Sequence, residues 1–186
     1  MTHSIPRLTF DELPRDIADA LRAKVERLGY LGEFFAATAH QPTALKAFID
    51  FTEAAKGELD MRLVELIALT VATMKRVAYE KNQHERLAVR LGYGREWVAA
   101  VERLAPSTEP QLSALEQCVQ QFVIAAVTRD GAETSALLEA VVERLGVEQA
   151  VAVLMVMGRY TTHAILVNSL GIQAPVPSIF EDNLEN

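Results

Sequence analysis

The residue types best suited to chemistry in this sequence are a glutamate and a histidine that stand close together. Glu80 and His84 are four positions apart, so on a helix their side chains share one face, with Cβ atoms roughly 5–6 Å apart. A carboxylate beside an imidazole fixes the imidazole tautomer and favours its protonated form. Such a pair is suited to general acid or base catalysis near neutral pH.

A second acidic residue, Glu65, lies inside an apolar stretch, between residues 63–64 and 66–67. A buried carboxylate must be paired, or its pKa must rise. Perturbed carboxylates gather at functional sites, although structural ion pairs perturb them as well. Glu65 is therefore a candidate catalytic residue, and the structural alternative is that it faces solvent or contacts Arg62 or Arg76.

The elements that must position these residues are helices. Apolar residues recur at steps of three and four, Ala and Leu are plentiful, and no segment alternates as a strand does. Whether the chain breaks near Val77 is left open. We predict an all-α, compact bundle of about eight or nine helices, with residues 1–173 as one domain and residues 174–186 as a C-terminal arm or tail. The predicted helices span residues 11–28, 31–39, 42–56, 61–76, 79–91, 95–104, 110–129, 132–145 and 147–170.

Composition narrows the classes of function. The net charge of the 186 residues is -7, with no basic patch, so we expect no nucleic-acid partner. The longest apolar run, residues 150–158, is much shorter than the roughly 20 residues of a membrane span, and residues 1–10 do not look like a secretory signal. The single cysteine, Cys118, excludes a disulfide or a cysteine-based zinc site within one chain. We predict a cytoplasmic protein with no membrane association.

The last predicted helix is apolar on nearly every side between residues 147 and 158. A helix of this kind is buried, either by other helices or by a partner subunit. Self-association of the chain is therefore expected.

The spacing of the candidate residues resembles a known motif. Glu65, eleven residues, Val77, two residues, Glu80, three residues and His84 are similar to the Glu-x11-Cys-x2-Cys-x3-His pattern of the carboxymuconolactone decarboxylase-like and alkylhydroperoxidase-like superfamily. In its peroxidase branch the two cysteines are the redox centre, and the glutamate and histidine form a proton relay. Here Val77 and Glu80 stand at the cysteine positions. Tyr79-Glu80 followed by His84 resembles the cysteine-less, decarboxylase-like branch instead.

The resemblance covers about residues 35–175, including the helix that carries His84 and the closing segment 158–171. It departs at Lys81, where decarboxylase-like sequences often have tryptophan, and this difference would alter the lining of the pocket. The resemblance implies an alkylhydroperoxidase-like bundle that assembles into trimers or hexamers. It also implies a pocket lined by the histidine helix near subunit contacts, and chemistry that needs no cofactor.

The function implied by the resemblance is that of a cofactor-free lyase acting on a small carboxylated lactone or a related carbon acid. In this interpretation His84 transfers the proton, Glu80 orients the His84 imidazole, and Glu65 extends the proton relay. A cation near the motif would neutralise a substrate carboxylate. For Tyr79, and for His163 of the last predicted helix, packing in the protein interior is the alternative role. The candidate substrate-binding residues are Tyr79, Arg76, Lys81 and His163.

Two other functions remain open at this stage. The protein could be a non-catalytic helical oligomer that binds a ligand or a partner, because the motif has lost both cysteines. A peroxide-reducing enzyme is disfavoured, because Cys118 lies outside the motif and has no resolving partner in the chain. No metal site is predicted: Glu80 and His84 supply two ligands, whereas a complete site needs a third and usually a fourth.

Overall fold

The computed structural model describes residues 4–181, and within them all regular structure is helical. The nine α-helices of the described residues confirm the predicted all-α fold. They are α1 (Arg15–Leu28), α2 (Glu33–Thr38), α3 (Pro42–Gly57), α4 (Met61–Met74), α5 (Ala78–Arg90), α6 (Arg95–Glu102), α7 (Ala114–Thr128), α8 (Ser135–Leu145) and α9 (Val147–Ser169), with short 3-10 helices at Phe10–Glu12 and Pro106–Thr108.

Local capping explains where the boundaries differ from the predicted ones. The first predicted helix is divided, because Pro14 becomes the N-cap of α1 and the preceding turn is a separate 3-10 helix. The helix predicted from residue 110 begins at Ala114 instead. There the Ser113 hydroxyl accepts from the Glu116 N–H while the Glu116 carboxylate accepts from the Ser113 N–H. This capping box satisfies two N–H groups that would otherwise lack partners, and so fixes the start of α7.

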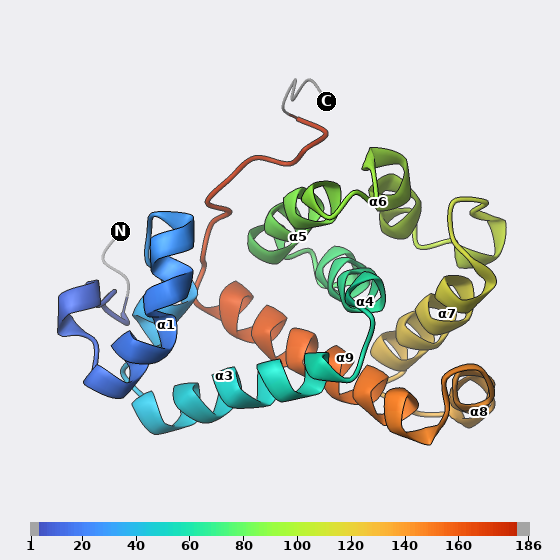
Figure 1. The fold of residues 1–186 in the computed structure, drawn as a ribbon, viewed down its shortest axis with the longest axis horizontal. Helices are drawn as coiled ribbons and strands as arrows, with labels where there is room; N and C mark the ends of the chain where they lie inside the picture. The colour runs from blue at the N-terminus through green and yellow to red at the C-terminus, as the bar shows by residue number, and fades with distance from the viewer. Residues whose placement is uncertain (1–3, 182–186) are drawn as a thin grey trace.

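The centre of the molecule is α4, which packs against α5, α6, α7 and α9 (Figure 1). Every residue from Leu63 to Ala72 is buried, including Glu65. A second, smaller apolar cluster joins α1, α2, the first half of α3 and the C-terminal half of α9. Because α9 contributes to both clusters, it connects the two halves of the fold.

One face of α9 is not covered within a single chain. Its exposed apolar residues are Val147, Val151, Met155, Ile165 and Leu166. By length and composition α9 is the one helix of the described residues that could cross a membrane, yet it packs against α3, α4 and α8 as a core helix. Self-association stays a prediction, and this face is where we expect a second copy.

The link between α4 and α5 settles whether the chain breaks near Val77. Helix α4 ends at Met74, and Arg76 adopts a left-handed backbone conformation with φ of 55°. A non-glycine residue in that region costs about 1–2 kcal/mol, and the turn it makes sends α5 back against α4. As a result Glu80 and His84, near the start of α5, come to face Glu65 on α4.

The opposite face of α5 is held by residues 174–181, here called the C-terminal strap (Figure 1). Asn82 Nδ2 donates to the carbonyl of Val176 at 2.9 Å. The buried Glu85 carboxylate accepts from Ser178 Oγ at 2.7 Å and from the Ile179 N–H at 2.8 Å through one oxygen. The helix that carries Glu80 and His84 is therefore fixed from both sides.

Replacing Glu85 with alanine should weaken this attachment. The buried hydroxyl and N–H would both lose their acceptor, so we expect the free energy of unfolding in urea to fall by about 1–3 kcal/mol. Limited proteolysis should cleave the C-terminal strap faster than in the wild type. Glu139→Ala, on the exposed surface of α8, is the matched control. Wild-type urea midpoints and cleavage rates in Glu85→Ala would contradict the proposed anchoring.

Candidate active site

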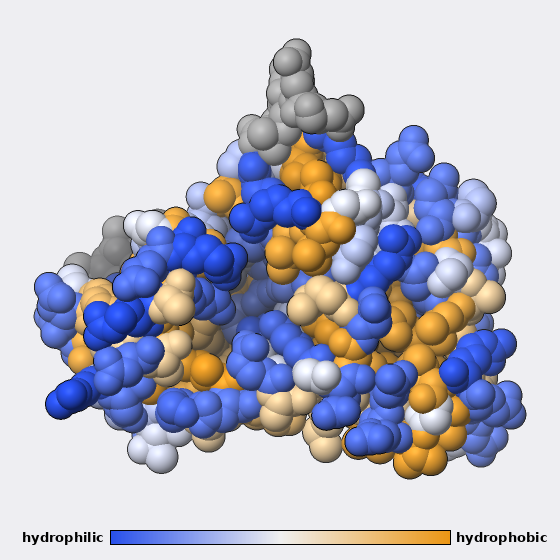
Figure 2. Space-filling model, viewed as in Figure 1, coloured by the Kyte–Doolittle hydropathy of each residue, from blue (hydrophilic) through white to orange (hydrophobic). Residues whose placement is uncertain are grey.

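A pocket of about 560 Å³ opens between α1, α3, α5 and α9. Figure 2 shows the surface hollowed at this point, with hydrophilic residues in its depth. The pocket reaches the face of α5 that carries the predicted motif. Its lining includes Lys24, Phe35, Phe48, Thr52, Glu53, Lys56, Tyr79, Glu80, Gln83, His84, Arg159 and His163.

The imidazole of His84 lies between two carboxylates. Its Nδ1 is 2.7 Å from Glu65 Oε2, and its Nε2 is 2.9 Å from Glu80 Oε2. Glu65 is only 1% exposed and Glu80 7%. The structure thus brings together all three predicted catalytic residues, two from α5 and one from α4.

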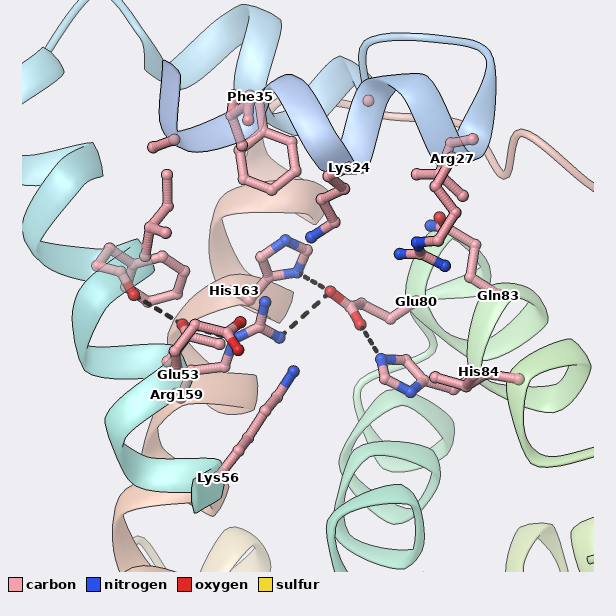
Figure 3. A pocket seen from close by; sticks show the side chains of 18 of the residues that line it. Lys24, Arg27, Phe35, Glu53, Lys56, Glu80, Gln83, His84, Arg159 and His163 are labelled. Carbon is pink, nitrogen blue, oxygen red and sulfur yellow. Dashed lines mark hydrogen bonds and ion pairs between the residues drawn. The ribbon is translucent and has the colours of Figure 1, made fainter. Parts of the chain in front are cut away.

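The second carboxylate oxygen of Glu80 faces α9 (Figure 3). His163 Nδ1 lies 2.6 Å from Glu80 Oε1, and Arg159 Nη1 lies 3.4 Å from the same atom. Arg159 is positioned in turn by Thr52 of α3, whose hydroxyl accepts from its Nε at 3.2 Å. A single carboxylate therefore connects two histidines and an arginine.

The two histidines that share Glu80 are driven to opposite protonation states. Burial alone would lower the pKa of His84, but the adjacent carboxylates of Glu65 and Glu80 reverse this and raise it to about 9. Burial also lowers the pKa of His163, and the partial opposition from Glu80 leaves that pKa below its ordinary value. At neutral pH we therefore expect His84 to be charged and His163 to be neutral.

The carboxylate between them stays ionised. Burial favours its neutral form, but contacts with His163, Arg159 and His84 hold the pKa of Glu80 well below its usual range. Because an ionised carboxylate only accepts hydrogen bonds, we infer that neutral His163 carries its proton on Nδ1. Its Nε2 is then left with a free lone pair.

Aromatic rings enclose the histidines. The His163 ring centroid is 4.0 Å from that of Phe34 and 6.2 Å from that of Tyr79. Tyr160 meets His84 edge-on, with centroids 5.2 Å apart. Burial and the charge of Glu80 raise the pKa of Tyr79 to about 12, so its hydroxyl remains a hydrogen-bond donor. These rings limit the access of water to the imidazoles.

The pocket carries more positive than negative side chains. Lys24, Lys56 and Arg159 lie around it from three helices, and only Glu53 and Glu80 oppose them among the carboxylates that line it. Burial lowers the pKa of Lys24 to about 8, with further lowering by the charges of Lys56 and Arg159. The pKa of Lys56 is lowered by burial and by Arg159. Such crowding of cations is typical of a site that receives an anion.

The predicted substrate-binding residues divide into two pairs. Tyr79 and His163 line the pocket. Arg76 is exposed at the turn after α4 and lies outside the lining. Lys81 is turned to the other side of α5, where its Nζ lies 2.9 Å from Glu85 Oε1 and 3.3 Å from Glu102 Oε2.

The cations that do face the pocket were not found from the sequence. Arg159 had a recognisable signal, as a charged residue within a long apolar helix that must be paired if it is buried. Lys24 and Lys56 had none, because each stands among other polar residues on an amphipathic helix. Only the packing of α1 and α3 around α9 brings them together. Among the described residues, no group of three or more His, Cys, Asp or Glu side chains is arranged to hold a metal ion.

The raised pKa of His84 has a measurable consequence for stability. Because this pKa lies above the unfolded value, the charged imidazole contributes stability that is complete below about pH 6.5 and is lost as the pH rises through about 9. The free energy of unfolding of wild type minus that of His84→Asn should therefore shrink by on the order of 3 kcal/mol between pH 7 and 10. Urea titrations at several pH values measure this difference. A difference that is constant or grows with pH would contradict the assignment.

Comparisons with known proteins give both a sequence match and a fold match. The sequence model of the carboxymuconolactone decarboxylase family matches residues 42–114. These residues include Glu65, Glu80 and His84 but not Arg159 or His163. A search of curated proteins finds none that matches significantly.

Several solved structures share the fold. An uncharacterised peroxidase-related protein from Ralstonia eutropha JMP134, with an alkylhydroperoxidase AhpD core, is 17% identical with a TM-score of 0.78, over 93% of this chain and 94% of that chain. The debrominase Bmp8, in complex with 2,3,4-tribromopyrrole, is 16% identical with a TM-score of 0.81, over 95% and 94%. A protein of unknown function from Agrobacterium tumefaciens is 20% identical with a TM-score of 0.66, over 75% and 96%.

These solved structures are only 16–20% identical to this chain, so their likeness to it carries the fold and not an activity. The family match is a match in sequence, and it covers the segment that contains Glu65, Glu80 and His84. Residues 42–114 therefore resemble the carboxymuconolactone decarboxylase family in sequence, and the chain shares the fold of the structure with an alkylhydroperoxidase core.

Proposed function

We propose that this protein is a cofactor-free enzyme that moves a proton at a carbon atom of a small carboxylated substrate, in a lyase reaction of the decarboxylase type. The observation that carries the proposal is the Glu80 carboxylate shared by two imidazoles, 2.9 Å from His84 and 2.6 Å from His163. Resemblance to the superfamily alone does not select a reaction.

An acid and a base are both present at the same pocket. When the environments of two titratable groups separate their pKa values, the group with the raised value can donate a proton and the group with the lowered value can accept one. Here protonated His84 is the candidate proton donor, and neutral His163 is the candidate proton acceptor. Because both contact Glu80, a proton taken up by His163 at Nε2 is stabilised by the same carboxylate that holds His84.

The charge of the pocket favours a carboxylated substrate. Lys56 and Arg159 line it beside the aromatic rings of Phe35 and Phe48. The cations would hold a carboxylate, and the rings would cover an apolar or unsaturated body. In a decarboxylation the electron pair released with CO₂ remains on carbon, and a nearby proton donor then completes the reaction.

Peroxide reduction by the superfamily's cysteine pair has no support in this pocket. Val77 is 1% exposed and has no reactive group, and Glu80 is bound to the two histidines. Cys118, the single cysteine, lies on α7 and packs against the main core. A thiol there has no contact with the pocket residues described above.

The proposal is tested by CO₂ release from 4-carboxymuconolactone. We expect turnover by the wild type, and a decrease in kcat of about 100-fold or more in His84→Asn and in His163→Asn, the usual contribution of one general acid or base. His40→Asn is the matched control, because His40 is exposed and binds only the Pro6 carbonyl. Its kcat should equal that of the wild type.

Two outcomes would contradict the proposal. Turnover that survives both active-site substitutions would show that the histidine pair takes no part in the reaction. Absence of turnover with 4-carboxymuconolactone and with other small carboxylated carbon acids would favour the alternative function, a helical oligomer that binds a ligand without converting it.

A further inference from the structure

Two lysines of the pocket have no acidic partner among residues 4–181. Lys24 of α1 contacts the ring of Phe35, with Nζ 4.7 Å from the ring centroid, and Lys56 of α3 lies 5.8 Å from that of Tyr160. Neither makes a hydrogen bond or an ion pair within the described residues. By contrast, Lys46 is paired with Asp50 at 2.6 Å, and Lys81 is paired with Glu85.

Lys24 lines the pocket, although as a residue it is exposed to solvent. Figure 3 shows its Nζ directed towards His163 and Glu80, with the Nζ of Lys56 approaching from the opposite side. The nearest carboxylate is already occupied, because Glu80 contacts both histidines and Arg159. The proximity of other cations disfavours an ammonium group at this position.

We propose that Lys24 Nζ is a nucleophile that forms a Schiff base with the aldehyde or ketone group of a small anionic substrate bound in this pocket. The inference rests on the proposed function and specifies its substrate class, a 3-oxo acid. Nζ lies over the ring of Phe35, which forms one wall of the pocket beside it. Lys56 and Arg159 remain available to bind the substrate carboxylate.

The electrostatics supply the free amine that such a reaction needs. Burial, Lys56 and Arg159 lower the pKa of Lys24 to about 8. At pH 7.5 about a quarter of Lys24 would then be unprotonated, against roughly a thousandth of an ordinary lysine. A neighbouring cation is an established means of activating a lysine for Schiff-base chemistry.

The chemistry balances: the water lost on forming the iminium ion is returned in hydrolysis, and the net reaction consumes one proton. The Nζ lone pair attacks the carbonyl carbon, the oxygen takes up a proton, and loss of water gives an iminium ion. The iminium nitrogen then accepts the electron pair of the bond to the carboxylate, so that CO₂ leaves and an enamine remains. His84 can supply the proton that returns to carbon, and hydrolysis releases the ketone and restores the amine. Lys24 would thus provide the electron sink for decarboxylation of a 3-oxo acid.

Reductive trapping tests the Schiff base directly. The purified chain is incubated with 4-formylbenzoate and sodium cyanoborohydride, and the resulting secondary amines are located by peptide mass spectrometry. We expect Lys24 to be modified at least about 10-fold faster than Lys46 at pH 7.5, since only the unprotonated amine reacts. The rate at Lys24 should be half-maximal near pH 8.

Substitutions complete the design. Lys24→Arg keeps the positive charge and should abolish the fast modification, whereas Lys46→Met should leave it unchanged. Modification of Lys24 no faster than that of Lys46 in the wild type would overturn the proposal. Fast modification that persists in Lys24→Arg would place the nucleophile elsewhere and would also overturn it.

The same experiment separates this proposal from the histidine chemistry. Fast modification of Lys24 in His84→Asn is expected, because imine formation with an aldehyde needs only the amine and the pocket. CO₂ release from a 3-oxo acid that continues in Lys24→Arg would overturn the Schiff base while leaving the proposed function intact. Trapping at Lys24 without any CO₂ release would sustain the Schiff base and count against the proposed carbon-acid reaction.

Discussion

The site depends on the sharing of one buried carboxylate among three groups that can carry positive charge. Glu80 is 7% exposed and contacts His84, His163 and Arg159. An isolated charge with so little water around it would be strongly disfavoured, and the three partners supply the compensation. Two adjacent imidazoles cannot both be charged at low cost. The carboxylate therefore holds one protonated and one neutral histidine.

Several parts of the fold place Glu80 and its partners within contact distance of one another. The left-handed turn at Arg76 reverses the chain so that α5 lies against α4 and His84 reaches Glu65. The C-terminal strap fixes the other face of α5 through Glu85. Helix α9 crosses the molecule and carries Arg159 and His163 to the opposite side of Glu80. Loss of any of these elements would change the distance between acid and base.

The sequence was sufficient for the fold class and for the residues within one motif. Helical periodicity and glycine stops predicted the helices, because those signals are local, and capping at Ser113 moved one boundary by a few residues. The meeting of Glu80 with His84 followed from a spacing of four. Its contact with His163 could not be predicted, since it joins positions 83 apart in sequence, from 80 to 163, through the packing of α9. The position of Lys24 and Lys56 at the pocket could not be predicted either, because nothing in their local sequence distinguishes them from surface lysines.

The most direct test of this account is the protonation of the two histidines, read from their ring nitrogen chemical shifts by NMR between pH 5 and 10. The account predicts that His84 stays protonated through neutrality and titrates near pH 9, while His163 is neutral at pH 7 with its proton on Nδ1. In Glu80→Gln both pKa values should fall, because the Glu80 carboxylate raises the pKa of each histidine. Histidines that titrate together near the ordinary value of about 6.5 in the wild type would contradict the central claim.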